Sequence, residues 1–446
     1  MPEAAALRVG LDGFNLAMAR GTGVATYARS LSHALKGLGC GVDVLYGLDV
    51  SPRAPAALRE TLFFAALGEG RSGGEAPEKI TLRRAVRRAF LSPKTRDLVE
   101  IPITGRVVAD AMAGRLPAFD RIFSLPSLFY LGARYFRRYG RFMPVRIPDP
   151  PAIMHWTYPL PLRLEGARNI YTLHDLVPLR LPFTSLEDRT YYDRLLRACV
   201  ATADHIVTVS ECSRRDIIAL LGADPDLVSN TYQAVTPSAA VAALDDAAVT
   251  QRLRTLFDLE AGGYLLFFGA IEPKKNLGRL IEAYLAADLA TPLVIAGPRA
   301  WKAESELRLL EGAHGVSLKG ADRVRRIDYV PTDQLAILVR GAKAVLFPAL
   351  YEGFGLPALE AMALGAPVLA ANTGSLPEVV GDAGLSVDPY DIQSMVDGLK
   401  RLDGDRSLRE RLSAAGQIQA EVFSMKAYQD RLAAVYRHTL AGASAV

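Results

Sequence analysis

The sequence predicts an α/β protein with two parallel β-sheets, each flanked by helices. Its 446 residues exceed the roughly 250–300 that a single hydrophobic core serves, so we expect two domains. Short apolar runs alternate with longer stretches of helical period, and this alternation occurs once in each half of the chain. Hydrophobic residues make up 50% of the chain and charged residues 22%, which excludes a disordered, collagenous or coiled-coil protein.

Each predicted sheet is read from its apolar runs. In the first half, with helices over 26–38 and 213–221 between them, the strand candidates are Leu7–Asp12, Val42–Tyr46, Ile153–His155, Asn169–Leu173 and His205–Val209. In the second half, they are Tyr264–Gly269, Pro292–Gly297, Ala344–Pro348, Pro367–Ala370 and Leu385–Val387. The small-residue stretch Pro237–Ala248 has no strand character, so we predict an N-terminal domain over 1–240 and a C-terminal domain over 249–424.

Residues of about 50–150 lack the strand rhythm, and we interpret them as a basic insertion in the first domain. Basic side chains cluster here at Arg83, Arg84, Arg87, Arg88, Lys94, Arg96, Arg134, Arg137, Arg138, Arg141 and Arg146. Aromatic residues accompany the second group, and a helix with arginines on one side and aromatics on the other suits an anionic membrane surface. We therefore expect membrane contact through about 80–146. A solvated basic helix over the core and an RNA-binding patch are the alternatives.

Global charge and cysteine content point to a cytoplasmic protein. The net charge of +4 is small for this length and does not call for nucleic acid, which we do not expect as a partner. The three cysteines show no close pairing and no metal-ligand spacing, which indicates a reducing compartment. No apolar run of about 18 residues occurs, and we expect the first segment to form a strand rather than a signal peptide. We expect a cytoplasmic protein, attached at most peripherally to the inner face of the membrane.

The segment Tyr351–Gly365, which reads YEGFGLPALEAMALG, carries the most specific chemistry. It predicts a glycine loop between a buried strand and a helix. Such a loop points backbone N–H groups and a helix N-terminus at its ligand, which favours a phosphate. Glu352 and Glu360 frame the loop, and carboxylates are good acceptors for paired sugar hydroxyls. The pattern therefore predicts a nucleotide-sugar pocket.

These glutamates at E-x7-E spacing, the GFGLP loop and the following PVLAANTGSLPEVVGDAGLSVDP resemble the retaining glycosyltransferases of family 4. The likeness is dense over about 264–400 and sparser at GTGVATYARSL, TLHDLVP and TVSECSRRDI. It implies the GT-B fold, in which two Rossmann-like domains face each other across a cleft and the last helix, here about 425–446, packs back on the first domain.

The resemblance also assigns roles in donor binding. Glu360 is expected to bind the ribose hydroxyls, and Glu352, also a catalytic candidate, the donor sugar. The pyrophosphate is expected on the backbone amides of Gly353, Phe354, Gly355 and Leu356. A cation of GAIEPKKN contacts the leaving diphosphate in the family; Lys275 is the first choice and a catalytic candidate, and Lys274 is the second. Ala270 stands where many members have an arginine, so the division of labour between the two lysines stays open.

The first domain is expected to contribute the acceptor side. Gly21 and Gly23 correspond to a family loop beneath the donor phosphates, and His174, at a predicted strand end, to a histidine that contacts sugar or acceptor. We take His174 as a catalytic candidate and His155 as a weaker one. Ser210 and Glu211 are expected to cap the helix that follows them.

We expect no metal and no other cofactor. The pairs Asp224–Asp226 and Asp403–Asp405 have the Asp-x-Asp pattern of metal-dependent transferases but lie in turn-like sequence away from the predicted pocket. The family works without metal.

The residues of these motifs most resemble those of bacterial mannosyltransferases of O-antigen, capsule or exopolysaccharide synthesis. GDP-mannose is therefore the first donor to test, and a lipid-linked or growing polysaccharide is the expected acceptor. A UDP-sugar donor, a nucleotide-sugar epimerase and a non-catalytic scaffold of the same fold remain alternatives.

Overall fold

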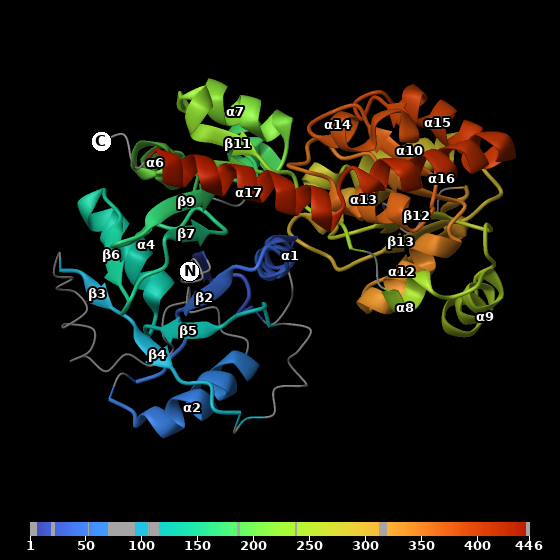
Figure 1. Cartoon of the computed structure of the whole chain (residues 1–446). Helices are drawn as coiled ribbons and strands as arrows, with labels where there is room; N and C mark the ends of the chain where they lie inside the picture. Colours follow the sequence, from blue (N-terminus) through green and yellow to red (C-terminus); the bar gives the residue numbers. More distant parts are fainter. Residues whose placement is uncertain are drawn as a thin grey trace.

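The computed structural model describes residues 7–18, 23–51, 53–69, 94–105, 107, 116–184, 188–236, 239–311 and 319–442. The chain forms two α/β domains that lie side by side, as predicted (Figure 1). Arg83, Arg84, Arg87, Arg88 and Gly21 lie outside the described residues.

The first domain is built on an eight-stranded sheet of order β11-β10-β9-β7-β1-β2-β5-β4. Its strands pair in parallel except for β4, which runs antiparallel to β5 at the edge. The strands are β1 (Arg8–Asp12), β2 (Gly41–Tyr46), β4 (Val99–Ile101), β5 (Arg121–Ser124), β7 (Ile153–Trp156), β9 (Arg168–Thr172), β10 (His205–Thr208) and β11 (Val228–Asn230). A small second sheet comprises β3 (Arg96–Asp97), β6 (Met143–Arg146) and β8 (Leu162–Leu164).

Helices cover both faces of this sheet, as parallel strands buried on both sides require. They are α1 (Gly23–Gly37), α2 (Ala56–Gly68), α4 (Leu128–Tyr139), α5 (Val177–Arg180), α6 (Arg189–Thr202) and α7 (Glu211–Leu221). Two 3-10 turns, η2 (Pro182–Thr184) and η3 (Pro225–Leu227), also belong to this domain.

The second domain has a six-stranded, fully parallel sheet of order β14-β13-β12-β15-β16-β17. Its strands are β12 (Leu265–Phe268), β13 (Leu293–Ala296), β14 (Val324–Ile327), β15 (Ala344–Phe347), β16 (Val368–Ala371) and β17 (Leu385–Val387). Its helices are α8 (Ala239–Ala242), α9 (Asp246–Phe257), α10 (Leu277–Ala287), α11 (Ala303–Glu311), α12 (Thr332–Gly341), α13 (Leu356–Ala363), α14 (Leu376–Val380), α15 (Ile392–Gly404) and α16 (Arg406–Glu421), with the 3-10 turn η4 (Pro273–Lys275).

The last helix, α17 (Met425–Ala441), leaves the second domain and returns to the first (Figure 1). Tyr428, Leu432, Val435 and Tyr436 are buried in the hydrophobic core that β1 and α1 also form. The Tyr436 hydroxyl lies 2.7 Å from Nδ1 of the buried His155 on β7. Helix α17 is therefore part of the first domain's core.

We expected no strands over residues of about 50–150, and this expectation is wrong. Strand β5 pairs with β2 and β4 pairs with β5, so this segment extends the main sheet. These strands are only four and three residues long, too short for a period-2 pattern to distinguish them from loops.

The amphipathic helix that we expected at a membrane is α4, and its aromatic side is not available to lipid. Phe129, Tyr135 and Phe136 are buried in the core beside Trp156. Arg137, Arg138 and Arg141 are exposed, and the Arg137 guanidinium lies over the Tyr191 ring, 4.6 Å from its centroid. The expectation that this aromatic side contacts a membrane is therefore wrong, because the core takes it. Among the described residues, no helix combines the length and the apolarity needed to cross a bilayer.

Candidate active site

The glycine loop after β15 lies directly against the first domain. A Cβ atom on Gly353 would stand 2.8 Å from Cβ and Oδ2 of Asp175 and 3.1 Å from the His174 carbonyl oxygen. Gly355 has a positive φ of 93° and precedes α13, where a Cβ atom would meet Leu376 at 2.7 Å. The two glycines are therefore required by close approach and by backbone conformation.

A lysine–glutamate pair sits beside this loop. Nζ of Lys275 lies 2.5 Å from Oε1 of Glu352, and the side chains are 19% and 14% exposed. Burial raises the pKa of Glu352, but Lys275 and Lys274 outweigh it and hold that pKa below its usual range. The Leu350 N–H donates to the Lys274 carbonyl oxygen at 2.8 Å, which ties η4 to the glycine loop. The structure thus brings Lys274, Lys275 and Glu352 together.

Lys274 is enclosed by carboxylates. Its Nζ lies 3.4 Å from Oε1 of Glu272. Burial lowers the pKa of Lys274, but Glu352, Asp175 and Glu272 raise it well above its usual range. Both lysines therefore carry positive charge next to the loop that was expected to hold a diphosphate.

Glu360 lies in the second turn of α13, apart from the lysine–glutamate pair. Burial raises its pKa to about 7, and none of the described residues donates a hydrogen bond to its carboxylate. A partly buried carboxylate without donors has capacity for two ligand hydroxyls.

Phe354 does not direct its side chain to a ligand. Its ring packs in the core with Tyr232 and Phe423, at centroid distances of 6.3 and 5.6 Å. Only the backbone of Phe354 can serve the expected donor contact. Helix α13 begins at Leu356, so the backbone N–H of Leu356 lies at its N-terminus.

Gly23 is the first residue of α1, and a Cβ atom built on it would have no neighbour within 4 Å.

His174 follows β9 at the carboxyl edge of the first sheet. Its Nε2 lies 2.8 Å from the Thr157 carbonyl oxygen, which requires a proton on Nε2, and its ring packs against Tyr27 at 4.8 Å. Burial lowers the pKa of His174, despite the hydrogen bond to Thr157 and the nearby Asp175, so the imidazole is neutral and Nδ1 is an acceptor.

His155, the weaker candidate, has a structural role. It is fully buried, with Nδ1 on the Tyr436 hydroxyl and Nε2 2.8 Å from Oγ1 of Thr172. Burial lowers its pKa to about 3. Both ring nitrogens are used within the core, so none faces a substrate.

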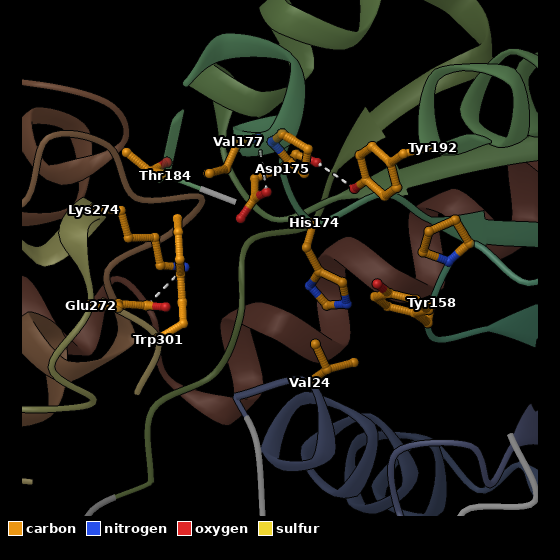
Figure 2. A pocket seen from close by; sticks show the side chains of 12 residues that line it. Val24, Tyr158, His174, Asp175, Val177, Thr184, Tyr192, Glu272, Lys274 and Trp301 are labelled. Carbon is orange, nitrogen blue, oxygen red and sulfur yellow. Dashed lines mark hydrogen bonds and ion pairs between the residues drawn. The ribbon is translucent and has the colours of Figure 1, made fainter. Parts of the chain in front are cut away.

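A cavity of about 300 Å³ opens between the domains beside these residues (Figure 2). The residues that line it are Val24, Tyr158, Pro159, His174, Asp175, Val177, Pro178, Thr184, Tyr192, Glu272, Lys274 and Trp301. Nine of these belong to the first domain and Glu272, Lys274 and Trp301 to the second, so the cavity spans the interdomain cleft.

Contacts that the sequence did not reveal hold the domains together around the loop. The Glu378 carboxylate on α14 accepts the backbone N–H groups of Glu211 (2.9 Å) and Cys212 (2.8 Å) at the start of α7. The Tyr351 hydroxyl donates to Oδ2 of Asp216 at 2.5 Å. A carboxylate from one domain thus caps a helix of the other. Ser210 caps the same helix as predicted, since its Oγ accepts the Ser213 N–H at 3.0 Å.

The two Asp-x-Asp pairs lie elsewhere. Asp224 caps η3, while Asp403 pairs with Lys343 at 2.6 Å in the last turn of α15 and Asp405 caps α16. None of them lines the cavity. Within the described part of the chain, no group of three or more His, Cys, Asp or Glu residues is arranged to hold a metal ion.

Two α/β domains with mainly parallel sheets, a cleft between them and a glycine loop at that cleft form the GT-B fold. The family model "Glycosyltransferase Family 4" matches residues 21–238, and the model "Glycosyl transferases group 1" matches residues 258–419. O-antigen chain mannosyltransferase B of Escherichia coli is 36% identical over 276 residues, which cover 59% of this chain and 68% of that protein. The chain belongs to glycosyltransferase family 4.

Two further similarities concern the share of a relative's length that this chain covers and the fold. The serotype-specific mannosyltransferase WbdA of Escherichia coli is 31% identical over 60% of this chain, but the match covers only 33% of WbdA. Sucrose-phosphate synthase of Thermosynechococcus elongatus superimposes with a TM-score of 0.62 at 18% identity, covering 98% of this chain and all of that one. The second likeness concerns the fold.

Proposed function

We propose that the protein is a retaining mannosyltransferase that moves mannose from GDP-mannose to a lipid-linked or growing polysaccharide acceptor. The observation that carries the proposal is the pair of lysines, Lys274 and Lys275, held beside Glu352 at the glycine loop in the interdomain cleft. The 36% identity to O-antigen chain mannosyltransferase B supports mannose as the transferred sugar.

In this proposal the second domain binds the donor. The Glu360 carboxylate accepts the ribose hydroxyls, and the amides of residues 353–356 bind the diphosphate at the start of α13. Glu352 accepts hydroxyls of the donor hexose. Gly23, at the start of α1, contacts the phosphates from the first-domain side.

The lysines stabilise the charge that develops during transfer. The bond between the hexose C1 and the diphosphate oxygen breaks, and C1 bonds to the acceptor oxygen on the same face. The acceptor hydroxyl proton passes to the departing phosphate oxygen, so no protein nucleophile is needed. Lys275, with Lys274 beside it, binds the diphosphate as its negative charge grows. His174, neutral and fixed by Thr157, contributes an acceptor nitrogen in the cleft where transfer takes place.

Because the lysines and the loop amides supply positive charge, we propose that the reaction needs no metal ion. Activity should persist in EDTA at the level measured without it. Loss of activity in EDTA that Mg²⁺ restores would refute this part of the proposal.

We further propose that the protein works at the cytoplasmic face of the membrane, held by charge alone. The exposed Arg137, Arg138 and Arg141 can bind anionic headgroups while the aromatic side of α4 stays in the core. Liposomes rich in anionic lipid should sediment the protein at low salt and release it at high salt. No sedimentation at any salt concentration would refute membrane attachment.

The deciding experiment is a panel of GDP- and UDP-sugars, assayed for thermal stabilisation and for sugar transfer. GDP-mannose should raise the melting temperature most and support transfer, and the new linkage should keep the α configuration of the donor by NMR. Stabilisation by a UDP-sugar instead would replace the donor. An isomerised sugar with donor alone would indicate an epimerase, and no conversion with any donor would indicate a scaffold.

A further inference from the structure

The interdomain cavity contains an aromatic side chain that donor binding does not use. Trp301 follows β13 and lines the cavity opposite His174 and Tyr158. In Figure 2 its ring is seen edge-on, with one face turned across the cavity toward His174. The Lys302 ammonium group lies over the same ring, 5.0 Å from its centroid. Its indole N–H has no acceptor among the described residues.

Backbone hydrogen bonds hold the segment before Trp301 beside the loop that carries the lysines. The Ala300 N–H donates to the Ile271 carbonyl oxygen at 3.1 Å, and the Ile271 N–H donates to the Pro298 carbonyl oxygen at 2.9 Å. Ile271 and Arg299 form an isolated parallel bridge. The position of Trp301 is thereby fixed relative to Glu272 and Lys274, which lie immediately after this bridge.

The polar groups around the cavity suit an uncharged ligand with hydroxyls. Asp175 and Glu272 bring two carboxylates and Lys274 one ammonium group, so the lining carries a net negative charge. Oδ1 of Asp175 accepts the Val177 N–H at 3.1 Å, and Oε1 of Glu272 lies 3.4 Å from Nζ of Lys274. The second oxygen of each carboxylate accepts no hydrogen bond from the described residues. A uronate would face the carboxylates of Asp175 and Glu272 here, whereas a sugar hydroxyl would find an acceptor.

The cavity size and its apolar wall narrow the ligand further. About 300 Å³ lies at the lower end of the roughly 300–1,000 Å³ of small-molecule pockets, which suits one sugar ring rather than a longer glycan. A hexopyranose has an apolar face of C–H groups that packs against an aromatic ring, and hydroxyls around its rim.

We propose that Trp301 is the platform on which the terminal hexose of the acceptor glycan stacks, with Asp175 and Glu272 accepting its hydroxyls. The acceptor terminus is then a neutral sugar, and its subsite is formed by both domains rather than by the first alone. This inference rests on the proposed glycosyl transfer. We place the donor hexose at Glu352 and Lys275, which pair with each other and are not among the residues that line the cavity.

Tryptophan fluorescence tests the stacking directly. The chain has two tryptophans, and Trp156 is fully buried against Tyr171, so a ligand-dependent signal reports on Trp301. With GDP present, methyl α-D-mannopyranoside should give a saturable change that Trp301→Phe abolishes, and sodium glucuronate should give none. No saturable change, or an unaltered change in the variant, would overturn the proposal. This readout does not depend on turnover, so it separates the inference from a failure of the proposed function.

Steady-state kinetics test which sugar occupies the cavity. With p-nitrophenyl α-D-mannopyranoside as acceptor, Trp301→Ala should raise the acceptor KM about tenfold and the donor KM much less, and Trp301→Phe should recover most of the loss. Ile418→Ala, at a position on α16 that is 74% exposed, is the matched control and should match the wild type. A larger rise in the donor KM would place the donor hexose in the cavity and overturn the proposal, as would unchanged constants.

Discussion

Replacing Lys275 by methionine keeps the volume of the side chain and removes its charge, which affects both stability and transfer. The Lys275–Glu352 pair has a 2.5 Å contact and both side chains are largely buried. Breaking a buried pair from one side costs about 3–5 kcal/mol. Lys274 also interacts favourably with Glu352, so the lower end of this range applies, about 3 kcal/mol. A domain of this size loses roughly 2–4 °C per kcal/mol, so the melting temperature should fall by about 6–12 °C.

The catalytic effect should exceed what this destabilisation explains. Removal of one preorganised donor to a developing anion lowers kcat by about 10²–10³-fold. We expect a loss of that size in Lys275→Met, measured at a temperature well below its transition. Retention of kcat within about threefold in a folded variant would refute the assignment of the leaving-group role to Lys275.

A double-mutant cycle separates the two effects. Lys275→Met combined with Glu352→Gln should recover much of the lost stability, because no unpaired carboxylate remains, while transfer stays low. The pH dependence follows from the lowered pKa of Glu352. The stability that the pair provides is present above the unfolded-state pKa of about 4.5 and is lost as the pH falls through the folded value. Calorimetry should therefore find the wild type and Lys275→Met converging in acid.

Three more substitutions test neighbouring parts of the site. Glu360→Gln should raise the melting temperature at pH 8 and hardly change it at pH 5, as measured by differential scanning fluorimetry. Because the pKa of Glu360 is raised to about 7, the wild type loses stability as the pH rises toward 7, and the variant does not. The variant should also bind the donor more weakly, and equal changes in melting temperature at both pH values would contradict the raised pKa. Gly353→Ala should reduce transfer at least tenfold, since its Cβ would stand 2.8 Å from Asp175, whereas wild-type kinetics would show that the loop can move away at little cost. Glu378→Ala leaves two N–H groups of α7 without their acceptor, a loss of about 1.5 kcal/mol in the contact between the domains. The donor KM should therefore rise about tenfold. An unchanged KM would mean that this contact does not help to hold the two domains together around the donor.

The sequence was sufficient where one continuous segment carries the geometry. The strand, glycine loop and helix over 344–363 follow from the apolar run, the glycines and Pro357, and they place Glu352 and Glu360. The lysines after β12 were expected at the site from the family resemblance, and the structure brings Lys275 beside Glu352.

The remaining features depend on contacts between distant segments. Glu378 lies 167 residues from the amide of Glu211 that it caps, and no periodicity links the two. Trp301 faces the cavity because a backbone bridge holds its loop beside Ile271. The short strands β4 and β5 are specified by pairing with β2 and with each other more than by their own composition, which is why they were read as an insertion.

The return of α17 to the first domain has a consequence for biosynthesis. During translation the N-terminal half leaves the ribosome first, yet its hydrophobic core lacks Tyr428, Leu432 and Tyr436 until nearly the whole polypeptide has been made. The sheet of the C-terminal half is complete once β17 (Leu385–Val387) has been made, before the synthesis of α17 begins. The domain translated first is therefore the one whose core is completed last.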